Sequence, residues 1–231
     1  MAKLFTHIIF SFSFLIISLT GCDAIFKRNI KEGIIVFEIT YPETDAGDLM
    51  ASLLPNEMIL KFKNNITVGE FNAGMGIFKT SLIAYPDRKE IAHLVKIMNK
   101  KYVLLIDSTE INDLYSELPE MKIELIDETK VIAGYKCKKA IVTFKDKIKD
   151  EFSIYYTNEI DIKNPNWSSP FHEIDGVLLE YQLRKYNFEM RLTAKEVKQS
   201  KIDSSDFDIP SDYKMITQDE MDEIFEGFKE I

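Results

Sequence analysis

Apolar and polar residues alternate with a period of two along most of the chain, a pattern typical of strands that bury one face. From Gly33 onward, Ile35, Phe37, Ile39 and Tyr41 share one such face. Turn-forming and charged residues separate the alternating segments, which predict roughly eleven strands. The predicted strands are 33–41, 58–62, 66–71, 77–84, 91–98, 102–106, 121–126, 139–144, 152–157, 177–183 and 188–197.

Two internal segments depart from this period and have helical spacing instead. Residues 45–54 place their apolar side chains on one stripe and stop at Pro55, which predicts a short helix. Residues 108–118 repeat the helical spacing, with Ser108 as the expected cap. The dipeptide Asn99-Lys100 predicts a tight turn between two strands.

The strongest local signal for a helix lies near the C-terminus. Thr217 and Glu220 have the spacing of a capping box, and Ile216 is placed to pack on Met221. The residues that follow put apolar side chains on one face and acidic side chains on the other. We therefore expect an amphipathic helix that ends the chain and covers a sheet.

Many strands in succession with few helices predict a mainly β (α+β) fold. A sheet of this size buries one face and tends to curl, so we expect a large curved antiparallel sheet or half-open barrel with a few covering helices. The concave face would then hold helices and an apolar cavity. A two-sheet β-sandwich is the alternative.

The N-terminus combines Lys3, an apolar run from Ile8 to Leu19, and the sequence Leu19-Thr20-Gly21-Cys22. The run is too short to span a bilayer and has the form of a secretory signal. This ending resembles the lipobox of bacterial lipoproteins, and the resemblance implies acylation of Cys22 after cleavage before it. We expect residues 1–21 to be a signal peptide, 22–32 an acylated tether and 33–231 a single β-rich domain.

Charge and cysteine content limit the partners and the source of stability. The 38 acidic residues outnumber the 29 Lys and Arg, giving a net charge of −9, which argues against nucleic acid as a partner. If Cys22 carries lipid, Cys137 is the one remaining cysteine and no intrachain disulfide forms. The domain must be stabilised by its core.

Residues that could catalyse a reaction or bind a metal ion are few and lie far apart in the sequence. His93 lies among apolar residues on one strand face, where a hydrogen-bonded core histidine is expected. His172, Glu173 and Asp175 lack the spacing of a metal site. Cys137 stands among lysines that could lower the pKa of its thiol, but it has no evident catalytic partner.

Two further groups of residues, three aspartates and the methionines, could bind a ligand. Asp203, Asp206 and Asp208 lack the glycine and terminal glutamate of a calcium loop and predict a turn. The methionines are spread over most predicted elements, where they fill a core or line an adaptable apolar cavity. We expect no metal, no cofactor and no catalytic residue, and hence no enzyme.

The second half carries a series of motifs. They are Gly134-Tyr135-Lys136-Cys137-Lys138-Lys139-Ala140, then Tyr155-Tyr156-Thr157-Asn158-Glu159-Ile160, then Ile174-Asp175-Gly176-Val177-Leu178-Leu179-Glu180, and finally Asp206-Phe207-Asp208-Ile209-Pro210-Ser211-Asp212-Tyr213. This series resembles the GLPGLI-type envelope proteins of Bacteroidetes and, distantly, the lipoprotein carriers LolA and LolB. The resemblance implies a half-barrel with helices over an apolar cavity.

These observations lead to two expectations for function. The first is an envelope lipoprotein, anchored to a membrane through acylated Cys22, that binds a lipid or other apolar ligand on the concave face. The second is a non-catalytic structural module that docks another envelope protein. The membrane and the leaflet are left open.

Overall fold

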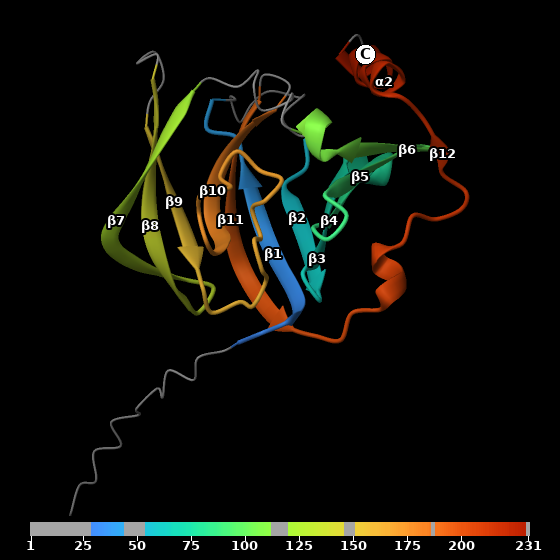
Figure 1. The fold of residues 1–231 in the computed structure, drawn as a ribbon. Helices are drawn as coiled ribbons and strands as arrows, with labels where there is room; N and C mark the ends of the chain where they lie inside the picture. The colour runs from blue at the N-terminus through green and yellow to red at the C-terminus, as the bar shows by residue number, and fades with distance from the viewer. Residues whose placement is uncertain (1–28, 44–53, 112–119, 146–150, 186–187, 230–231) are drawn as a thin grey trace, which may run out of the picture.

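The computed structural model describes residues 29–43, 54–111, 120–145, 151–185 and 188–229. Within these residues, twelve strands form one strongly curved sheet that does not close into a barrel (Figure 1). The predicted curved sheet is therefore confirmed, and the two-sheet sandwich is wrong. All neighbouring strands are antiparallel except β12, which runs parallel to β6.

The sheet order combines two meanders that meet in the middle. It is β12-β6-β5-β4-β3-β2-β1-β11-β10-β9-β8-β7, so β1 pairs with β11 at the centre. The elements are β1 (Glu32–Thr40), β2 (Glu57–Lys63), β3 (Ile66–Ala73), η2 (Gly74–Gly76), β4 (Phe78–Tyr85), β5 (Glu90–Ile97), β6 (Lys100–Asp107), β7 (Met121–Ile132), β8 (Tyr135–Phe144), β9 (Phe152–Thr157), β10 (Val177–Lys185), β11 (Phe188–Gln199), η3 (Ser204–Phe207), β12 (Lys214–Met215) and α2 (Gln218–Lys229).

Two turns differ from the sequence-based expectation. The turn between β5 and β6 is Met98-Asn99, one residue earlier than predicted, because Ile97 pairs with Lys100 and Met98 takes a φ of 52°. Strands β7 and β8 are longer than predicted and meet at Ala133-Gly134. Both turn residues have positive φ, at 49° and 82°, as the favoured two-residue hairpin turns require.

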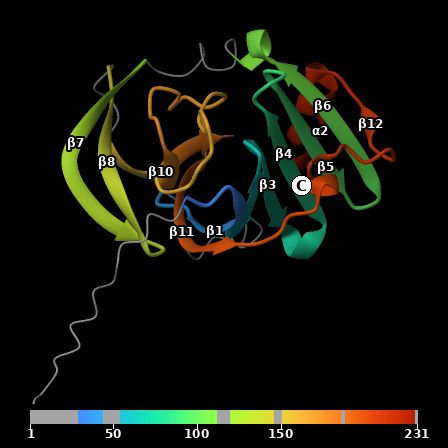
Figure 2. The same cartoon turned by 60° about the horizontal axis from the view of Figure 1, so that its bottom comes forward.

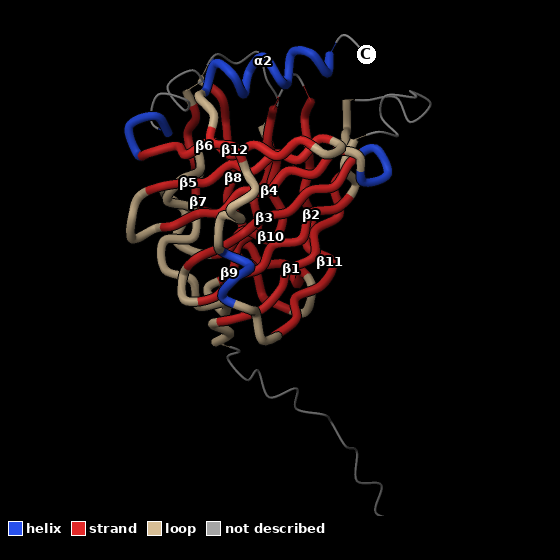
Figure 3. Tube along the Cα trace, turned by 90° about the vertical axis from the view of Figure 1, so that its right-hand side faces the viewer, coloured by secondary structure: helices blue, strands red, loops and turns tan. Residues whose placement is uncertain are grey.

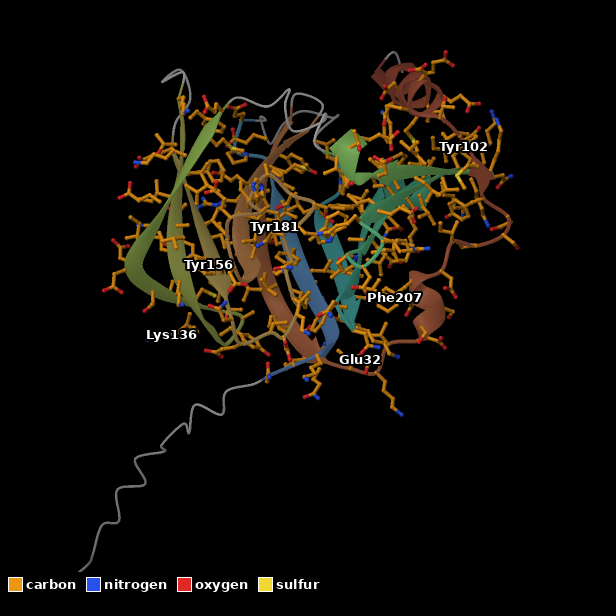
Figure 4. The ribbon with its side chains drawn as sticks, viewed as in Figure 1. Glu32, Tyr102, Lys136, Tyr156, Tyr181 and Phe207 are labelled. Carbon is orange, nitrogen blue, oxygen red and sulfur yellow. The ribbon has the colours of Figure 1, made fainter. Side chains whose placement is uncertain are left out.

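The convex face of β2 to β6 is covered by the segment that connects β11 to β12. A row of convex residues including Val68, Ile83 and Leu94 packs against Ile202 and Phe207 of this segment. The Tyr85 hydroxyl donates to the Phe207 carbonyl at 2.6 Å. Figure 4 shows Phe207 beside the outer surface of β3, so this side of the sheet is closed by the chain itself.

The concave face is filled in large part by the connection between β9 and β10, residues 158–176, here called the inner segment. Figure 2 shows this segment inside the curve of the sheet. Its Ile160 and Ile162 are buried against Phe37 and neighbouring residues of β1 and β11. Its Phe171 and Ile174 are buried against β8 and β9. The expected open cavity is therefore replaced over much of this face by protein.

A buried asparagine holds the inner segment in place. The Asn166 side-chain amide donates to the Ile174 carbonyl at 2.7 Å and to the Gly176 carbonyl at 2.9 Å. Gly176 has a φ of 154°, and a Cβ there would lie 2.7 Å from the Tyr156 ring. Only glycine fits this position without displacing Tyr156.

Helix α2 covers the concave face of β5 and β6 near the top of the sheet (Figure 3). The predicted capping box is confirmed: the Thr217 N–H donates to Glu220 Oε2 at 2.9 Å, and the Glu220 N–H donates to Thr217 Oγ1 at 3.3 Å. Ile216 and Met221 are both buried in the same cluster, as the staple requires.

The other two predicted helices are only partly described. Ser108 to Ile111 are helical, and Asp107, not Ser108, is the cap, since its Oδ1 accepts the N–H groups of Thr109 and Glu110 at 2.8 and 3.0 Å. The predicted helix at 45–54 lies outside the described residues except for Leu54.

A buried carboxylate joins the long β7–β8 hairpin to the centre of the sheet. The Glu180 side chain is only 6% exposed and accepts hydrogen bonds from Lys130 at 2.7 Å and from Arg191 at 3.0 Å. These cations come from β7 and β11, on either side of β10. The ammonium of Lys130 also lies 4.8 Å from the centre of the Tyr155 ring.

We expect Glu180→Gln to lower the free energy of unfolding by about 1–3 kcal/mol, because it removes the carboxylate that two cations share in a largely desolvated place. Urea denaturation of the variant and of the parent measures this difference. Glu124→Gln is the matched control, since Glu124 pairs with Lys122 on the surface at 3.5 Å and should change stability by less than about 0.5 kcal/mol. Equal effects of the two substitutions would contradict this role for Glu180.

Candidate functional site

Half-buried apolar side chains gather on the part of the concave face that the inner segment leaves accessible. They come from β2, β3, β10 and β11 and from the end of β1, and they pack against the buried core beneath them. We call this set the apolar patch: Tyr41, Leu60, Phe71, Tyr181, Leu183 and Met190. Partly exposed side chains of this kind offer an apolar ligand contacts without unfolding the core.

Tyr181 stands at the centre of these contacts. Its ring packs edge-to-face on Phe37 at 5.9 Å and on Phe171 of the inner segment at 6.4 Å between ring centres. Burial raises the pKa of Tyr181 above its ordinary value, and it raises the pKa of Tyr41 to about 12. Both phenols are therefore neutral at physiological pH, and the patch carries no charge from them.

Gly69 is a buried glycine in the middle of the concave face. It pairs with Leu60 on one side and Leu82 on the other, so a side chain at this position would point to the same face as theirs. A Cβ there would meet Met58 Sδ at 3.5 Å and Leu60 Cδ1 at 3.8 Å, which are ordinary contacts. Glycine is thus not required by backbone strain, and Gly69 is itself buried among larger apolar neighbours.

Sequence reasoning missed both Gly69 and Tyr181 as site residues. A glycine inside a predicted strand is a signal for close approach of a ligand or another chain, and it was available at 66–71. Tyr181 gave no such signal, because an aromatic residue in an alternating strand is equally typical of core.

The patch is closed at one end of the sheet. Ile30, just before β1, bridges Ile160, and Ile30, Ile160 and Ile162 are buried at 5%, 3% and 8% exposure. Tyr41, Leu183 and Met190 lie instead where β1, β10 and β11 reach their upper ends. The apolar patch therefore reaches from the middle of the concave face, where Leu60 pairs with Ile35, to its upper end.

A separate groove of about 330 Å³ lies beside α2. Tyr102, Ile216 and Ile224 supply its apolar lining, and Lys214, Glu220 and Glu223 supply its polar lining. Tyr102 is seen at the upper right of Figure 4, away from Tyr181. Glu220 already accepts hydrogen bonds from the Thr217 N–H of the capping box and from Lys214 at 3.2 Å. Two of the three polar side chains that line this groove are therefore paired with each other.

His93 and His172 lie in different parts of the fold and do not form one site. His93 is buried under α2, where its Nε2 lies 2.9 Å from Thr80 Oγ1 and its ring stacks on Phe225 at 6.0 Å. This confirms the expected hydrogen-bonded core histidine. His172 is exposed on the inner segment with Glu173 and Asp175, as expected of a polar loop. Among the described residues, no group of three His, Cys, Asp or Glu could hold a metal ion.

The Asp203 cluster is a turn, as predicted. Asp203 Oδ1 accepts from the Ser205 N–H at 3.0 Å and caps η3, while Asp206 pairs with Lys61 of β2 at 2.9 Å. These contacts fix the connecting segment on the convex face.

The methionines do not line one cavity. Met58 and Met221 are buried in different clusters, whereas Met98 and Met215 are exposed on the surface. Met190 belongs to the apolar patch, while Met50 and the Met75 side chain lie outside the described residues. The sequence-based suggestion of a methionine-lined cavity is therefore wrong for the described part of the chain.

Cys137 is inaccessible despite its lysine neighbours in sequence. Its side chain is fully buried, and burial raises the pKa of its thiol to about 12. Lys136 and Lys138 point to solvent, and Lys139 pairs with Glu128 at 2.9 Å. The lysines therefore do not activate the thiol.

We expect Cys137 in the native domain to resist alkylation by iodoacetamide at pH 8 and to react fully in urea, because a buried thiol with a raised pKa is neither accessible nor ionised. Mass spectrometry of the treated protein measures this. Leu125→Cys in a Cys137→Ala background places a thiol at a position that is 62% exposed and should react in the native state. Native alkylation of Cys137 as fast as this control would show that the core opens.

The N-terminal predictions lie outside the described residues. Cys22, the signal segment and the first part of the tether fall within 1–28. In the described part of the chain, no helix has the length and hydropathy of a membrane span.

Comparison with known families identifies residues 75–221, from the end of η2 into α2, as matching the model described as N-glycanase peptide, N-terminal domain. The chain belongs to this family. The match includes the whole span, 134–213, in which the motifs resemble the GLPGLI-type proteins. The inner segment and the ion pairs of Glu180 lie within the matched residues.

Structural comparison finds more distant likeness. A protein described as MucB superposes with a TM-score of 0.34 and 8% identity, over 82% of this chain and 62% of that one. The chain thus spans less than two thirds of the MucB chain. Comparison with curated proteins finds no match.

Proposed function

We propose that this protein is a non-catalytic, lipid-anchored module of the bacterial envelope that binds an apolar, chain-like ligand on its concave face. The observation that supports the proposal is the apolar patch. Its six side chains are only partly buried against the core of the concave face, so a ligand with an acyl chain could bury them further.

The anchor in this proposal is acylated Cys22. Its support is the lipobox-like sequence Leu19-Thr20-Gly21-Cys22, and two or three acyl chains would hold the domain stably at a membrane. The tether precedes β1, which begins at the lower end of the sheet in Figure 1.

No catalytic role is proposed from the family description. Among the described residues, the side chains that could act in catalysis lie in different places. His93 lies under α2, Cys137 is buried, and His172 is on the surface of the inner segment. Catalysis needs a nucleophile or base, its partner and a substrate position in one place. A binding role requires only an apolar surface, and none of these three residues belongs to the apolar patch.

A second candidate is a structural or protein-interaction module of the envelope. The observation that favours it is the inner segment, which fills much of the concave face with the protein's own side chains. A domain completed in this way does not need a ligand to bury its core. The two candidates differ in whether the purified domain takes up an apolar chain.

We expect Gly69→Leu to weaken binding of pyrene-labelled hexadecanoic acid at least tenfold, because the new side chain takes up contacts with Leu60 and Phe71 of the apolar patch, which a Cβ at this position already meets. Fluorescence titration of the mature chain measures the affinity, and native mass spectrometry detects lipid that co-purifies. Asn72→Leu is the matched control: Asn72 is exposed on the same strand, at a position of opposite orientation, so binding should change by less than about twofold.

Unfolding in urea shows whether each variant remains folded. Absence of co-purified lipid together with absence of uptake by the parent would overturn the ligand proposal and favour the interaction module. Equal binding by Gly69→Leu and the parent would show that the ligand lies elsewhere.

A further inference from the structure

Strand β7 forms a free edge of the twelve-stranded sheet. The sheet order ends with β7, which pairs with β8 on its inner side and with no described strand on its outer side. The opposite edge differs, because β12 pairs with β6 there. β7 is 12 residues long and is the outermost strand at the left of Figure 1. Such an edge strand presents a row of backbone N–H and C=O groups with which another strand can pair.

The side chains in the first half of β7 are accessible. Those of Lys122 and Glu124 are 71% and 62% exposed, and they form an ion pair at 3.5 Å on one face of the strand. Leu125 is 62% exposed and lies on the other face, with Met121 and Ile123. Met121 and Ile123 are partly buried against residues of β8 and β9. One face of this half of β7 is thus charged, and the other is apolar.

The charges of β7 restrict how the strand can pair with a second copy of itself. In an antiparallel pair, residues directly opposite each other point to the same face, and like charges there are destabilising. A two-fold axis at Lys122 would place two lysines opposite each other, and an axis at Glu124 would do the same with two glutamates. An axis at Leu125 would extend the pairing into the irregularity between Ile126 and Thr129. These three registers are therefore unfavourable.

A two-fold axis at Ile123 avoids all of these conflicts. It places Lys122 of each copy opposite Glu124 of the other, so opposite charges meet at both positions of the charged face. On the apolar face, it places Met121 opposite Leu125 and brings the two Ile123 side chains together. Every opposed position from 121 to 125 lies within the regularly paired part of β7. Both faces of the strand are therefore self-complementary in this register.

We propose that the chain forms a two-fold symmetric dimer, in which the first half of β7 pairs antiparallel with the same segment of a second copy. The same surface is then used on both subunits, as in other dimers with a two-fold axis. Charged edge strands usually resist pairing with other chains. Here the same charges select one register. This inference does not depend on the apolar patch, so its failure would leave the proposed function unchanged.

Charge reversal tests the interface in solution. Sedimentation equilibrium of the mature chain carrying Cys22→Ala measures the dissociation constant of the dimer. Lys122→Glu should raise this constant by at least about tenfold, because it places like charges opposite each other on both sides of the axis. Adding Glu124→Lys should return it to within about threefold of the parent, since opposite charges meet again. Lys138→Glu, at an exposed position of β8, is the matched control and should change it by less than about twofold.

Disulfide cross-linking tests the register. In the mature chain with Cys22→Ala and Cys137→Ala, Ile123→Cys places one thiol of each copy at the two-fold axis, with Cβ atoms about 4.5–5.5 Å apart. Glu124→Cys instead places the thiols at the axis of an unfavourable register. On oxidation with copper phenanthroline, the Ile123→Cys chain should form linked dimers at least about tenfold faster than the Glu124→Cys chain, because only its thiols meet the geometry of a disulfide.

Three results would overturn the proposed dimer. The first is a parent chain that stays monomeric at millimolar concentration. The second is a dimer that tolerates Lys122→Glu, and the third is cross-linking of the two cysteine variants at equal rates, since either result would place the contact elsewhere. Urea unfolding of each variant shows whether it remains folded, and recovery by the double charge reversal separates a lost interface from a damaged domain.

Discussion

The fold depends on how a twelve-stranded open sheet buries its concave face without closing into a barrel. The inner segment solves this problem: it contributes Ile160 and Ile162 to one cluster and Phe171 to another, and it carries Trp167 to the cluster under α2. Since an irregular segment has few backbone hydrogen bonds of its own, it must be held by others. Asn166 supplies two of them, which makes one buried amide important for three parts of the core.

Two meanders joined at β1 and β11 leave two ends of the sheet to be stabilised differently. At one end, β12 is a strand of only 2 residues, and α2 and the convex segment cover β5 and β6 from both faces. At the other end, the long β7–β8 hairpin is joined to the centre by Glu180, which binds one cation from each side. One end is thus held by apolar burial and the other partly by charge.

The strands could be predicted from the sequence because alternation is local and follows directly from a half-buried sheet. The capping box of Thr217 and Glu220 was predictable for the same reason. The inner segment was not, since nothing in residues 158–176 shows that a polar loop with His172 and Glu173 on its surface turns its isoleucines inward. The Met98-Asn99 turn was misplaced by one residue, because a methionine at positive φ is unusual and the pairing of Ile97 with Lys100 decides the register.

Under the proposed function, the concave face has two parts, one for stability and one for binding, in a domain whose one cysteine is Cys137. The lower part is packed with fully buried residues such as Ile35 and Phe62 and supplies stability. The upper part keeps Tyr41, Leu183 and Met190 half-buried, so a ligand can cover them without displacing that core. In the proposed function, burial of additional apolar area on a ligand contributes about 25 cal/mol per Å² to binding. The contact between Tyr181 and Phe171 joins the proposed binding surface to the inner segment that completes the core.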